Sequence, residues 1–329
     1  MNTDKSNMRE VINQSASQFA EGIKLAKSTK AGDQFTNVVI CGIGGSALPP
    51  DIINSLVVPS VPIYVRRDYN LPKEANENSL VVGMSYSGNT EETISAIDEA
   101  VEKGLKCIGI ATGGKLEELA QKNNFHFVKI PAGIQPRSAT GYMFSALATV
   151  LTNCGIIPDL SKDILETSEK LSKINSELEK EGKTLAKKLV DKIPIVYASS
   201  NLQAVARIWK IKFNENSKIP AFYNYLPELN HNEMVGYTQV KKSSNFHVLI
   251  IKDKDDHERI TKRMNLLSDI LKNKKVAVDF IETKEGSLMF RMFASLLLGD
   301  WTSYYLALNY NIDPTPVAMV EEFKKKMTE

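Results

Sequence analysis

Short runs of apolar, largely β-branched residues alternate along this chain with longer stretches that have helical spacing. In the first half such runs occur at 37–41, 61–65, 80–84, 106–110 and 125–130. The clearest helical stretch between them extends from Thr90 to Lys103. Parallel strands need a crossover connection, which is usually a helix, so this rhythm predicts an α/β fold built on a parallel, doubly wound sheet.

The chain is long enough for two such domains, at roughly 150 residues each. Between Lys162 and Leu189 the sequence is charged, free of proline and apolar at helical spacing, which predicts a helical connector. Strand-like runs then return at 193–197, 246–251 and 276–280, and segment 195–200 resembles 39–44 in preceding a helix. We therefore predict two doubly wound parallel-sheet domains that form a pseudo-repeat. The predicted parts are an N-terminal helical arm at 1–30, a first domain at 31–155, the connector at 156–190, a second domain at 191–312 and a C-terminal tail helix at 313–329.

Composition narrows the class of protein. Lys and Arg number 41 against 39 Asp and Glu, so the net charge of +2 gives no reason to expect a nucleic-acid or membrane-surface partner. Cys41, Cys107 and Cys154 lie far apart and are expected to be reduced, buried thiols. The most apolar stretch, 288–308, contains Arg291, which argues against a membrane span. With no signal sequence at its start, the chain is expected to be soluble and cytoplasmic.

The first candidate for chemistry is the glycine-rich segment Gly42–Ala47, which follows a predicted strand. Glycines let the backbone approach an anion closely, and a helix N-terminus offers free N–H groups. A tight turn that binds nothing would use the same residues. The segment also fits a dinucleotide fingerprint, in which Arg66 or Arg67 would hold the 2′-phosphate of NADP.

The second candidate follows the next strand, where Ser85, Ser87 and Thr90 place three hydroxyls around one glycine. Asn89 with Glu92 also fits a helix capping box, but capping needs only one side chain. Two such loops at the carboxyl ends of parallel strands predict a crevice for a single phosphate group. The Walker lysine is missing, so a nucleoside triphosphate is not expected.

Two further segments carry titratable side chains. Glu215 lies in 209–218, where a charge paired with Lys212 or Lys218 is the simpler interpretation. His231 lies in 226–234 among amides, where most histidines are hydrogen-bonded loop residues. With four histidines and no helical His pair, neither segment predicts a zinc or iron site.

Together these segments resemble the bifunctional phosphoglucose/phosphomannose isomerases, which are built from two SIS (sugar isomerase) domains. The resemblance extends from about Val38 to Asp313. It is carried by 42–46 and 85–93, and more specifically by 136–137, 214–218, 227–233 and 299–303. It implies a homodimer that acts on a sugar phosphate without a cofactor or metal. A non-catalytic SIS sensor is the alternative, although a sensor would not need both Glu215 and His231.

The resemblance also implies roles for individual residues. Glu215 corresponds to the general base, His231 to the acid that opens the sugar ring, and Arg137 to the arginine that stabilises the enediolate. Thr302 corresponds to a small residue that permits dual specificity, at the start of an expected helix. The phosphate ligands fall on Gly44, Gly45, Ser46, Ser85, Ser87 and Thr90. The family's catalytic lysine has no clear counterpart: Asn309 and Tyr310 occupy the corresponding stretch, and Lys324 is the alternative if the tail folds back.

Overall fold

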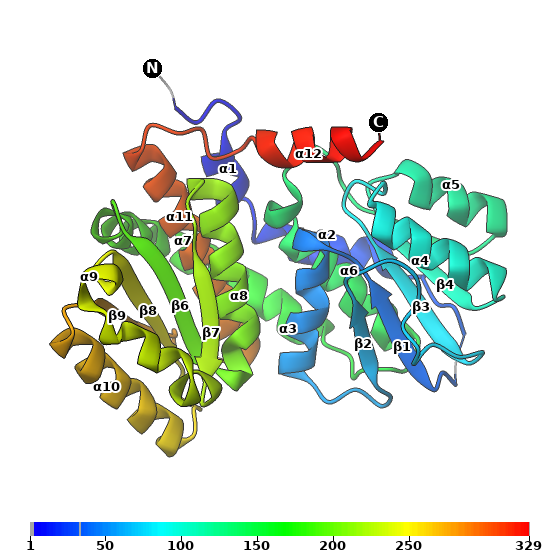
Figure 1. Ribbon diagram of the computed structural model, residues 1–329. Helices are drawn as coiled ribbons and strands as arrows, with labels where there is room; N and C mark the ends of the chain where they lie inside the picture. The colour runs from blue at the N-terminus through cyan, green and yellow to red at the C-terminus, as the bar shows by residue number, and fades with distance from the viewer. Residues whose placement is uncertain (1–2, 33, 329) are drawn as a thin grey trace. The chain divides into compact units, whose positions relative to one another are not determined.

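The computed structural model describes residues 3–32 and 34–328 (Figure 1). Contacts between residues divide the chain into two compact units. We call Gln14–Ser172 the N-terminal unit, and Met1–Asn13 together with Lys173–Glu329 the C-terminal unit. Each unit is built around one parallel sheet, as the alternating pattern predicts.

The sheet of the N-terminal unit has the strand order β2-β1-β3-β4-β5, and its neighbouring strands all run parallel. Alternate residues of a strand point to opposite faces. On one face Val39 and Val81 pack with Ala96 and Ile97 of α4, in a cluster of buried apolar residues. The elements are α2 (Ser17–Ala26), β1 (Asn37–Cys41), α3 (Leu48–Leu56), β2 (Ile63–Arg66), β3 (Ser79–Met84), α4 (Glu91–Glu102), β4 (Lys106–Ala111), α5 (Gly114–Asn123), β5 (His126–Lys129) and α6 (Thr140–Asn153).

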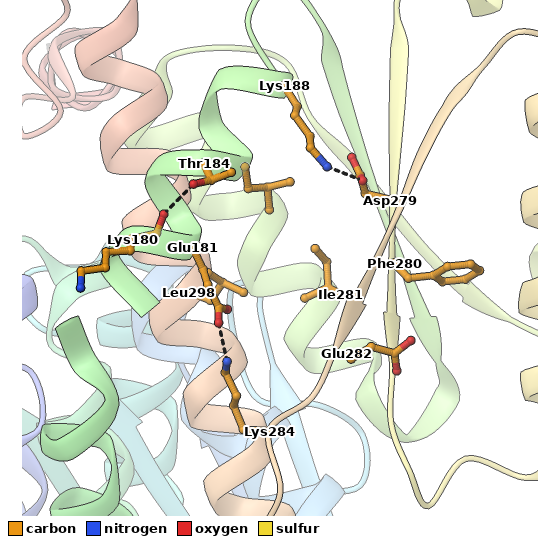
Figure 2. Close-up of a pocket in the computed structure, with 11 residues that line it drawn as sticks. Lys180, Glu181, Thr184, Lys188, Asp279, Phe280, Ile281, Glu282, Lys284 and Leu298 are labelled. Carbon is orange, nitrogen blue, oxygen red and sulfur yellow. Dashed lines mark hydrogen bonds and ion pairs between the residues drawn. The ribbon is translucent and has the colours of Figure 1, made fainter. Parts of the chain in front are cut away.

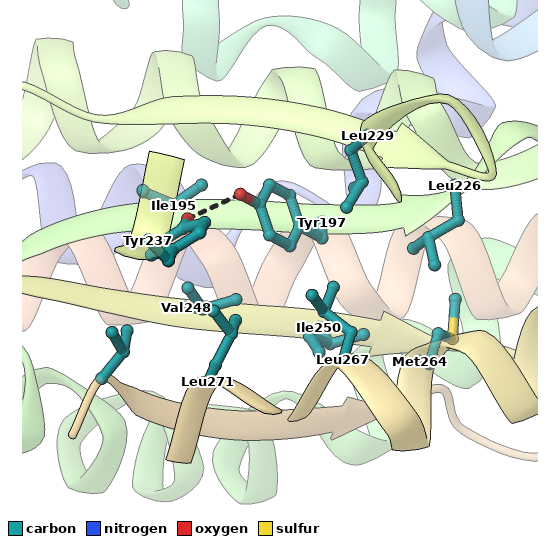
Figure 3. Close-up of a cluster of buried hydrophobic side chains, with 11 residues drawn as sticks. Ile195, Tyr197, Leu226, Leu229, Tyr237, Val248, Ile250, Met264, Leu267 and Leu271 are labelled. Atoms are coloured by element: carbon teal, nitrogen blue, oxygen red, sulfur yellow. Dashed lines mark hydrogen bonds between the residues drawn. The ribbon is translucent and has the colours of Figure 1, made fainter. Parts of the chain in front are cut away.

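The sheet of the C-terminal unit has the order β7-β6-β8-β9, again parallel. Figure 3 shows its core, in which Tyr197 and Ile250 from the sheet face Met264 and Leu267 from α10. The elements are α1 (Met8–Asn13), β6 (Ile193–Ser199), α8 (Gln203–Lys212), β7 (Phe222–Leu226), α9 (Val240–Ser243), β8 (Phe246–Lys252), α10 (Glu258–Asn273), β9 (Ala277–Glu282), α11 (Leu288–Asn309) and α12 (Ala318–Thr328), while α7 (Ser161–Lys188) begins in one unit and ends in the other.

The predicted fold class, two doubly wound parallel sheets in a pseudo-repeat, is confirmed. In strand order, β6 has the place of β1 and β8 the place of β3. The strand β7 was missed by the sequence pattern. It lies at the edge of its sheet with Phe222 and Tyr223 exposed, so it lacks the buried apolar run that marks the central strands.

The contacts group two segments differently from the predicted arm at 1–30 and connector at 156–190. Each of these two segments is divided between the units, at 13/14 and at 172/173. Phe19 of α2 packs edge-to-face on Phe144 of α6, with ring centroids 6.4 Å apart. Asp4, by contrast, accepts a hydrogen bond from the hydroxyl of Tyr304 in α11 at 3.2 Å. The contacts of α2 thus place it in the N-terminal unit, and the contact of Asp4 with α11 places the start of the chain in the C-terminal unit.

Helix α11 corrects a second expectation, because no helix begins at Thr302. A single helix extends from Leu288 to Asn309, through Gly299 and Asp300. A Cβ at Gly299 would lie 3.0 Å from the indole ring of Trp209, and buried Lys212 forms a 2.6 Å ion pair with Asp300. Gly299 allows α11 to pack closely against α8. The Gly299–Asp300 dipeptide, which resembles a helix break in the sequence, therefore lies inside the helix.

The three cysteines are buried, as expected, and none of them forms a disulfide. Burial raises the pKa of the Cys41 and Cys107 thiols to about 12, so both stay protonated at neutral pH. Among the described residues, no helix combines the length and the apolar character that crossing a bilayer requires.

Candidate functional site

Both predicted phosphate loops lie at the topological switch point of the N-terminal sheet. The strand β1 has β2 on one side and β3 on the other, so the chain leaves β1 and β3 toward opposite sides of the sheet. In open α/β sheets this divergence creates the crevice where ligands bind, at the carboxyl ends of the strands. The glycine loop follows β1 and the serine loop follows β3, so the fold brings them to one edge.

The glycine loop forms a 3₁₀ turn at Gly44–Ala47 that leads into α3. Gly44 is exposed and has a φ of +59°, in the left-handed region that favours glycine. A Cβ at Gly45 would lie 2.9 Å from the backbone nitrogen of Arg137, so only glycine lets this turn pack on the Pro136–Ser138 turn. The Oγ of Ser46 accepts a 2.9 Å hydrogen bond from the backbone of Tyr86. The glycine loop is thereby joined to the serine loop.

In the serine loop the hydroxyls have different environments. Ser85 is fully buried, and its Oγ accepts a 3.0 Å bond from the Gly88 backbone and lies 2.7 Å from Oγ1 of Thr90. Ser87 is exposed, and its Oγ accepts a 3.2 Å bond from the backbone of Asn89, which leaves its own O–H to donate. Ser85 therefore shapes the loop, while Ser87 faces solvent as a donor.

The capping-box alternative for this loop is wrong. The cap of α4 is Thr90, whose side chain makes no capping hydrogen bond. The side-chain oxygen of Asn89 accepts instead from the backbone of Lys115, at 3.0 Å. A Cβ at Gly88 would fall 1.7 Å from the carbonyl oxygen of Gly113, so the loop lies tightly against the start of α5. Asn89 therefore holds two loops together.

Arg137 lies in the same unit as the phosphate loops. Its side chain is 1% exposed, and its Nη1 donates to Oε1 of Gln135 at 3.2 Å. A guanidinium keeps its charge when buried, so Arg137 carries a fixed positive charge, and its backbone lies against Gly45 of the glycine loop. The structure thus brings the glycine loop and the turn that carries Arg137 into contact.

The arginines of the NADP interpretation are engaged elsewhere. The Nε of Arg66 donates to the carbonyl oxygen of Asn70 at 3.0 Å, and Arg67 forms an ion pair with Asp51. The strand order 2-1-3-4-5 also differs from the 3-2-1-4-5-6 order typical of dinucleotide-binding sheets. These contacts and this topology disfavour a dinucleotide at Gly42–Ala47.

The corresponding edge of the C-terminal sheet carries acidic side chains. The loop after β8 carries Asp253 and Asp255, which both pair with the buried guanidinium of Arg291, at 2.7 and 2.5 Å. Burial alone would raise the pKa of the Asp253 carboxyl, but the bonds from Arg291 outweigh burial and lower it. Ionised carboxylates repel phosphate, so among the described residues this edge is less suited to a phosphate group than the edge that carries the glycine and serine loops.

Glu215 lies in a π-helical turn, Phe213–Ser217, that continues α8. π-turns are rare and occur frequently at functional sites. The turn is fixed on α11, because Nδ2 of Asn216 donates to Oγ of Ser303 at 2.9 Å and Oγ of Ser217 donates to the Ser303 carbonyl at 2.7 Å. Glu215 itself is half-buried. Its neighbours Asn216 and Ser217 thus fix the turn that carries Glu215.

His231 is exposed at the end of a 3₁₀ turn, Glu228–His231, that follows β7. The next 3₁₀ turn is anchored by Glu233, whose carboxylate accepts from the hydroxyl of Tyr197 and from the side-chain amide of Asn224. The Tyr197 hydroxyl also lies 2.6 Å from that of Tyr237 (Figure 3). Burial raises the pKa of both phenols, so they remain protonated donors.

Sequence reasoning missed this anchoring role of Glu233. The available signal was a carboxylate two residues after His231, in a chain where Tyr197 lies within the predicted strand at 193–197. Nothing in the linear pattern shows that Tyr197 and Glu233 meet. We call the side chains of Tyr197, Asn224, Glu233 and Tyr237 the loop anchor.

Thr302 lies inside α11 and is fully buried. Its Oγ1 donates to the Leu298 carbonyl at 2.7 Å, so its hydroxyl is used by the backbone of its own helix. Its neighbour Ser303 is the residue that holds the Glu215 turn. Thr302 is therefore adjacent in the chain to Ser303, which bonds to the turn that carries Glu215.

A pocket of about 520 Å³ lies elsewhere in the C-terminal unit, between α7, β9 and α11 (Figure 2). Four of its charged residues form ion pairs across it: Lys188 with Asp279 at 2.7 Å, and Lys284 with Glu181 at 2.6 Å. The sequence-predicted site residues do not line it. Within the part of the chain that the structure describes, no cluster of three or more His, Cys, Asp or Glu could hold a metal ion.

Comparisons with known proteins show which proteins this chain is similar to. Residues 178–327 match the model of the bacterial phospho-glucose isomerase C-terminal SIS domain. The chain is 40% identical to a bifunctional phosphoglucose/phosphomannose isomerase of Caldicellulosiruptor bescii, with 94% of each chain covered. It is 34% identical to one of Aquifex aeolicus, with 89% of this chain and 91% of that one covered. The tagatose-6-phosphate ketose/aldose isomerase of Escherichia coli has the same fold, with a TM-score of 0.66, 18% identity and 93% of each chain covered.

Proposed function

Because the chain belongs to the family of the bifunctional phosphoglucose/phosphomannose isomerases, we propose that it interconverts glucose 6-phosphate and mannose 6-phosphate with fructose 6-phosphate. The observation that carries this proposal is the 40% identity over 94% of both chains. The chain is thus an enzyme of the aldose–ketose isomerase class. The roles of individual residues are part of the proposal.

The phosphate group is held by the two loops at the switch point of the N-terminal sheet. Ser87 and Thr90 donate hydroxyl hydrogens, and the Gly44–Ser46 turn offers backbone N–H groups at a helix start. Ser46 contributes mainly by joining the two loops and Ser85 by shaping the serine loop, as their hydrogen bonds indicate. Binding the phosphate contributes free energy remote from the reacting carbons, which orients C1 and C2.

Proton transfer is assigned to Glu215 and His231. The carboxylate of Glu215 removes the proton at C2 and returns it to C1 through a cis-enediol. The imidazole of His231 delivers the proton that opens the ring, which an imidazole can do near neutral pH. The guanidinium of Arg137 stabilises the negative charge that develops on the enediolate. We assign no step to a lysine.

Dual specificity is assigned to the small size of Thr302. Mannose 6-phosphate differs from glucose 6-phosphate only in configuration at C2, so one base serves both sugars if the enediol can rotate about C2–C3. Since its hydroxyl is bonded to the Leu298 carbonyl, Thr302 acts here by its size and not as a donor to substrate.

The test is a coupled assay that starts from fructose 6-phosphate and measures both aldose products. Wild-type protein is expected to form both, and Glu215→Gln is expected to lose on the order of 100-fold or more in kcat. Glu258→Gln, an exposed carboxylate at the start of α10, is the matched control and should retain full activity. Formation of one product only would restrict the function to that sugar. Full turnover by Glu215→Gln would show that Glu215 is not the base.

We also propose that the enzyme works in the cytoplasm as a homodimer. Three buried cysteines that form no disulfide suit a reducing compartment. Cell fractionation followed by an activity measurement tests the location, because activity confined to the membrane or secreted fraction would contradict it. Light scattering of the purified protein tests the oligomeric state, because the mass of a single chain would contradict a dimer.

A further inference from the structure

The segment that leads from β5 to the Arg137 turn has an irregular backbone. Residues 130–135, which the structure describes in full, form neither helix nor strand. We call residues 131–138 the arginine segment. Its first three residues are exposed, and Gly133 among them has a φ of +102°, whereas Arg137 near its end is fully buried. An irregular surface segment that carries a buried side chain needs bonds from neighbouring elements to keep that side chain in place.

Tyr86 of the serine loop provides such bonds at the start of the arginine segment. Its side chain is buried, and its hydroxyl donates to the carbonyl oxygen of Pro131 at 3.1 Å. The same oxygen accepts a 3.2 Å hydrogen bond from the backbone N–H of Ile134. Burial raises the pKa of the phenol, so Tyr86 keeps the proton that it donates at neutral pH. One hydroxyl therefore bonds the backbone at both ends of the 131–134 stretch.

The backbone of Tyr86 is bonded within the phosphate loops. Its N–H donates to Oγ of Ser46 in the glycine loop at 2.9 Å. Its carbonyl oxygen accepts a 2.9 Å hydrogen bond from the N–H of Thr112, which follows β4. Ser85 and Ser87 flank Tyr86 in the chain. The main chain of Tyr86 thus holds the phosphate loops together, while its side chain holds the arginine segment.

Gln18 of α2 fastens the far end of the arginine segment. Its side-chain amide donates to the carbonyl oxygen of Ser138 at 2.8 Å and accepts from the N–H of Gly141 at 3.1 Å. A Cβ at Gly141 would lie 2.8 Å from the Cβ of Gln18, so α6 begins in close contact with α2. The turn that carries Arg137 therefore lies between a bond to the serine loop on one side and bonds to α2 on the other.

We infer that the hydroxyl of Tyr86 positions Arg137 for the reaction. The inference rests on the proposed function, in which the guanidinium of Arg137 stabilises the charge of the enediolate. The phosphate loops fix one end of the substrate, and Tyr86 fixes the arginine segment relative to these loops. A displacement of about 1 Å in a group that meets the reacting atoms can cost about 100-fold in rate. Tyr86 is thus a positioning residue that acts through Arg137.

Tyr86→Phe tests this inference, because it removes the hydroxyl and keeps the ring. In the fructose 6-phosphate assay we expect kcat to fall by about tenfold or more, while KM changes by less than about twofold because the backbone bonds of the phosphate loops remain. Tyr64→Phe, at a half-buried position of the edge strand β2, is the matched control and should keep the wild-type kcat. An unchanged kcat for Tyr86→Phe would overturn the inference. A rise in KM alone would also overturn it, because the hydroxyl would then serve phosphate binding.

A double-mutant cycle separates positioning from general damage. Arg137→Met lacks the guanidinium that Tyr86 positions, so adding Tyr86→Phe to Arg137→Met should lower kcat by less than about twofold further. If the two losses multiply, Tyr86 acts independently of Arg137 and the inference is wrong.

Hydrogen exchange measures the arginine segment independently of turnover. The amide of Ile134 loses its acceptor in Tyr86→Phe, so peptides that cover 131–138 should exchange several-fold faster, while peptides that cover the glycine loop should keep their wild-type rates. Unchanged exchange in the arginine segment would contradict the inference whatever the activity of the protein. Failure of the wild-type protein to isomerise fructose 6-phosphate would instead contradict the proposed function, so the two failures are distinguishable.

Discussion

Replacement of Tyr197 by Phe tests whether the loop anchor holds His231 in place. The Tyr197 hydroxyl donates to the carboxylate of Glu233 and lies 2.6 Å from the hydroxyl of Tyr237. Phenylalanine keeps the ring in the core and removes only the oxygen, so no large cavity forms. The expected effects therefore come from lost hydrogen bonds and not from repacking.

The magnitude follows from the two bonds. A hydrogen bond to a charged group contributes about 1.5–3 kcal/mol, and a buried hydroxyl that loses its partner costs about 1–3 kcal/mol. Tyr237 is only 5% exposed, so water does not readily replace the lost partner. Because the two effects overlap, we expect the free energy of unfolding to fall by about 2–4 kcal/mol. With an m-value of about 2 kcal/mol per M, the urea midpoint drops by about 1–2 M.

Urea unfolding monitored by circular dichroism measures the stability, and the fructose 6-phosphate assay measures kcat and KM. We expect kcat to fall because the turn that begins at Glu233, next to His231, loses its anchor. KM should change little because the phosphate loops are intact. Tyr223→Phe, on the exposed edge strand β7, is the control and should change stability by less than about 0.5 kcal/mol. An unchanged midpoint and kcat for Tyr197→Phe would refute the anchoring argument.

Three further perturbations follow from the structure. Changing Ser87 and Thr90 to Ala removes two donors worth about 1.5–3 kcal/mol each, so KM for sugar phosphates should rise at least tenfold; an unchanged KM would limit these hydroxyls to loop structure. Thr302→Gln adds bulk at a fully buried position, and we expect mannose 6-phosphate turnover to fall roughly tenfold while glucose 6-phosphate turnover persists. Equal losses on both sugars would indicate general packing damage. Arg291→Met leaves Asp253 buried and unpaired, which should cost about 3–5 kcal/mol in urea unfolding. Because the bonds from Arg291 outweigh burial and lower the pKa of Asp253 in the folded state, the wild-type pair stabilises the folded protein above pH ~4. This stabilisation is lost as the pH falls further. An identical acid unfolding transition in Arg291→Met would contradict this.

The sequence alone determined the fold class and the position of the phosphate loops. The central strands are buried on both faces, so they must be short and uniformly apolar, and that run is visible without any tertiary contact. Glycines and hydroxyls directly after two such strands then fall at one sheet edge, because parallel strands share their carboxyl ends. These inferences use only local composition and the period of the chain, which is why the structure confirms them.

Tertiary contacts decided the remaining features. The edge strand β7 is half exposed and has no apolar run, and Gly299 lies inside a continuous helix because the indole of Trp209 needs its space. The anchoring of the His231 loop by Glu233 joins residues 36 positions apart. Each of these features depends on which surfaces meet after folding, and a linear sequence carries no local signal for a contact between distant side chains.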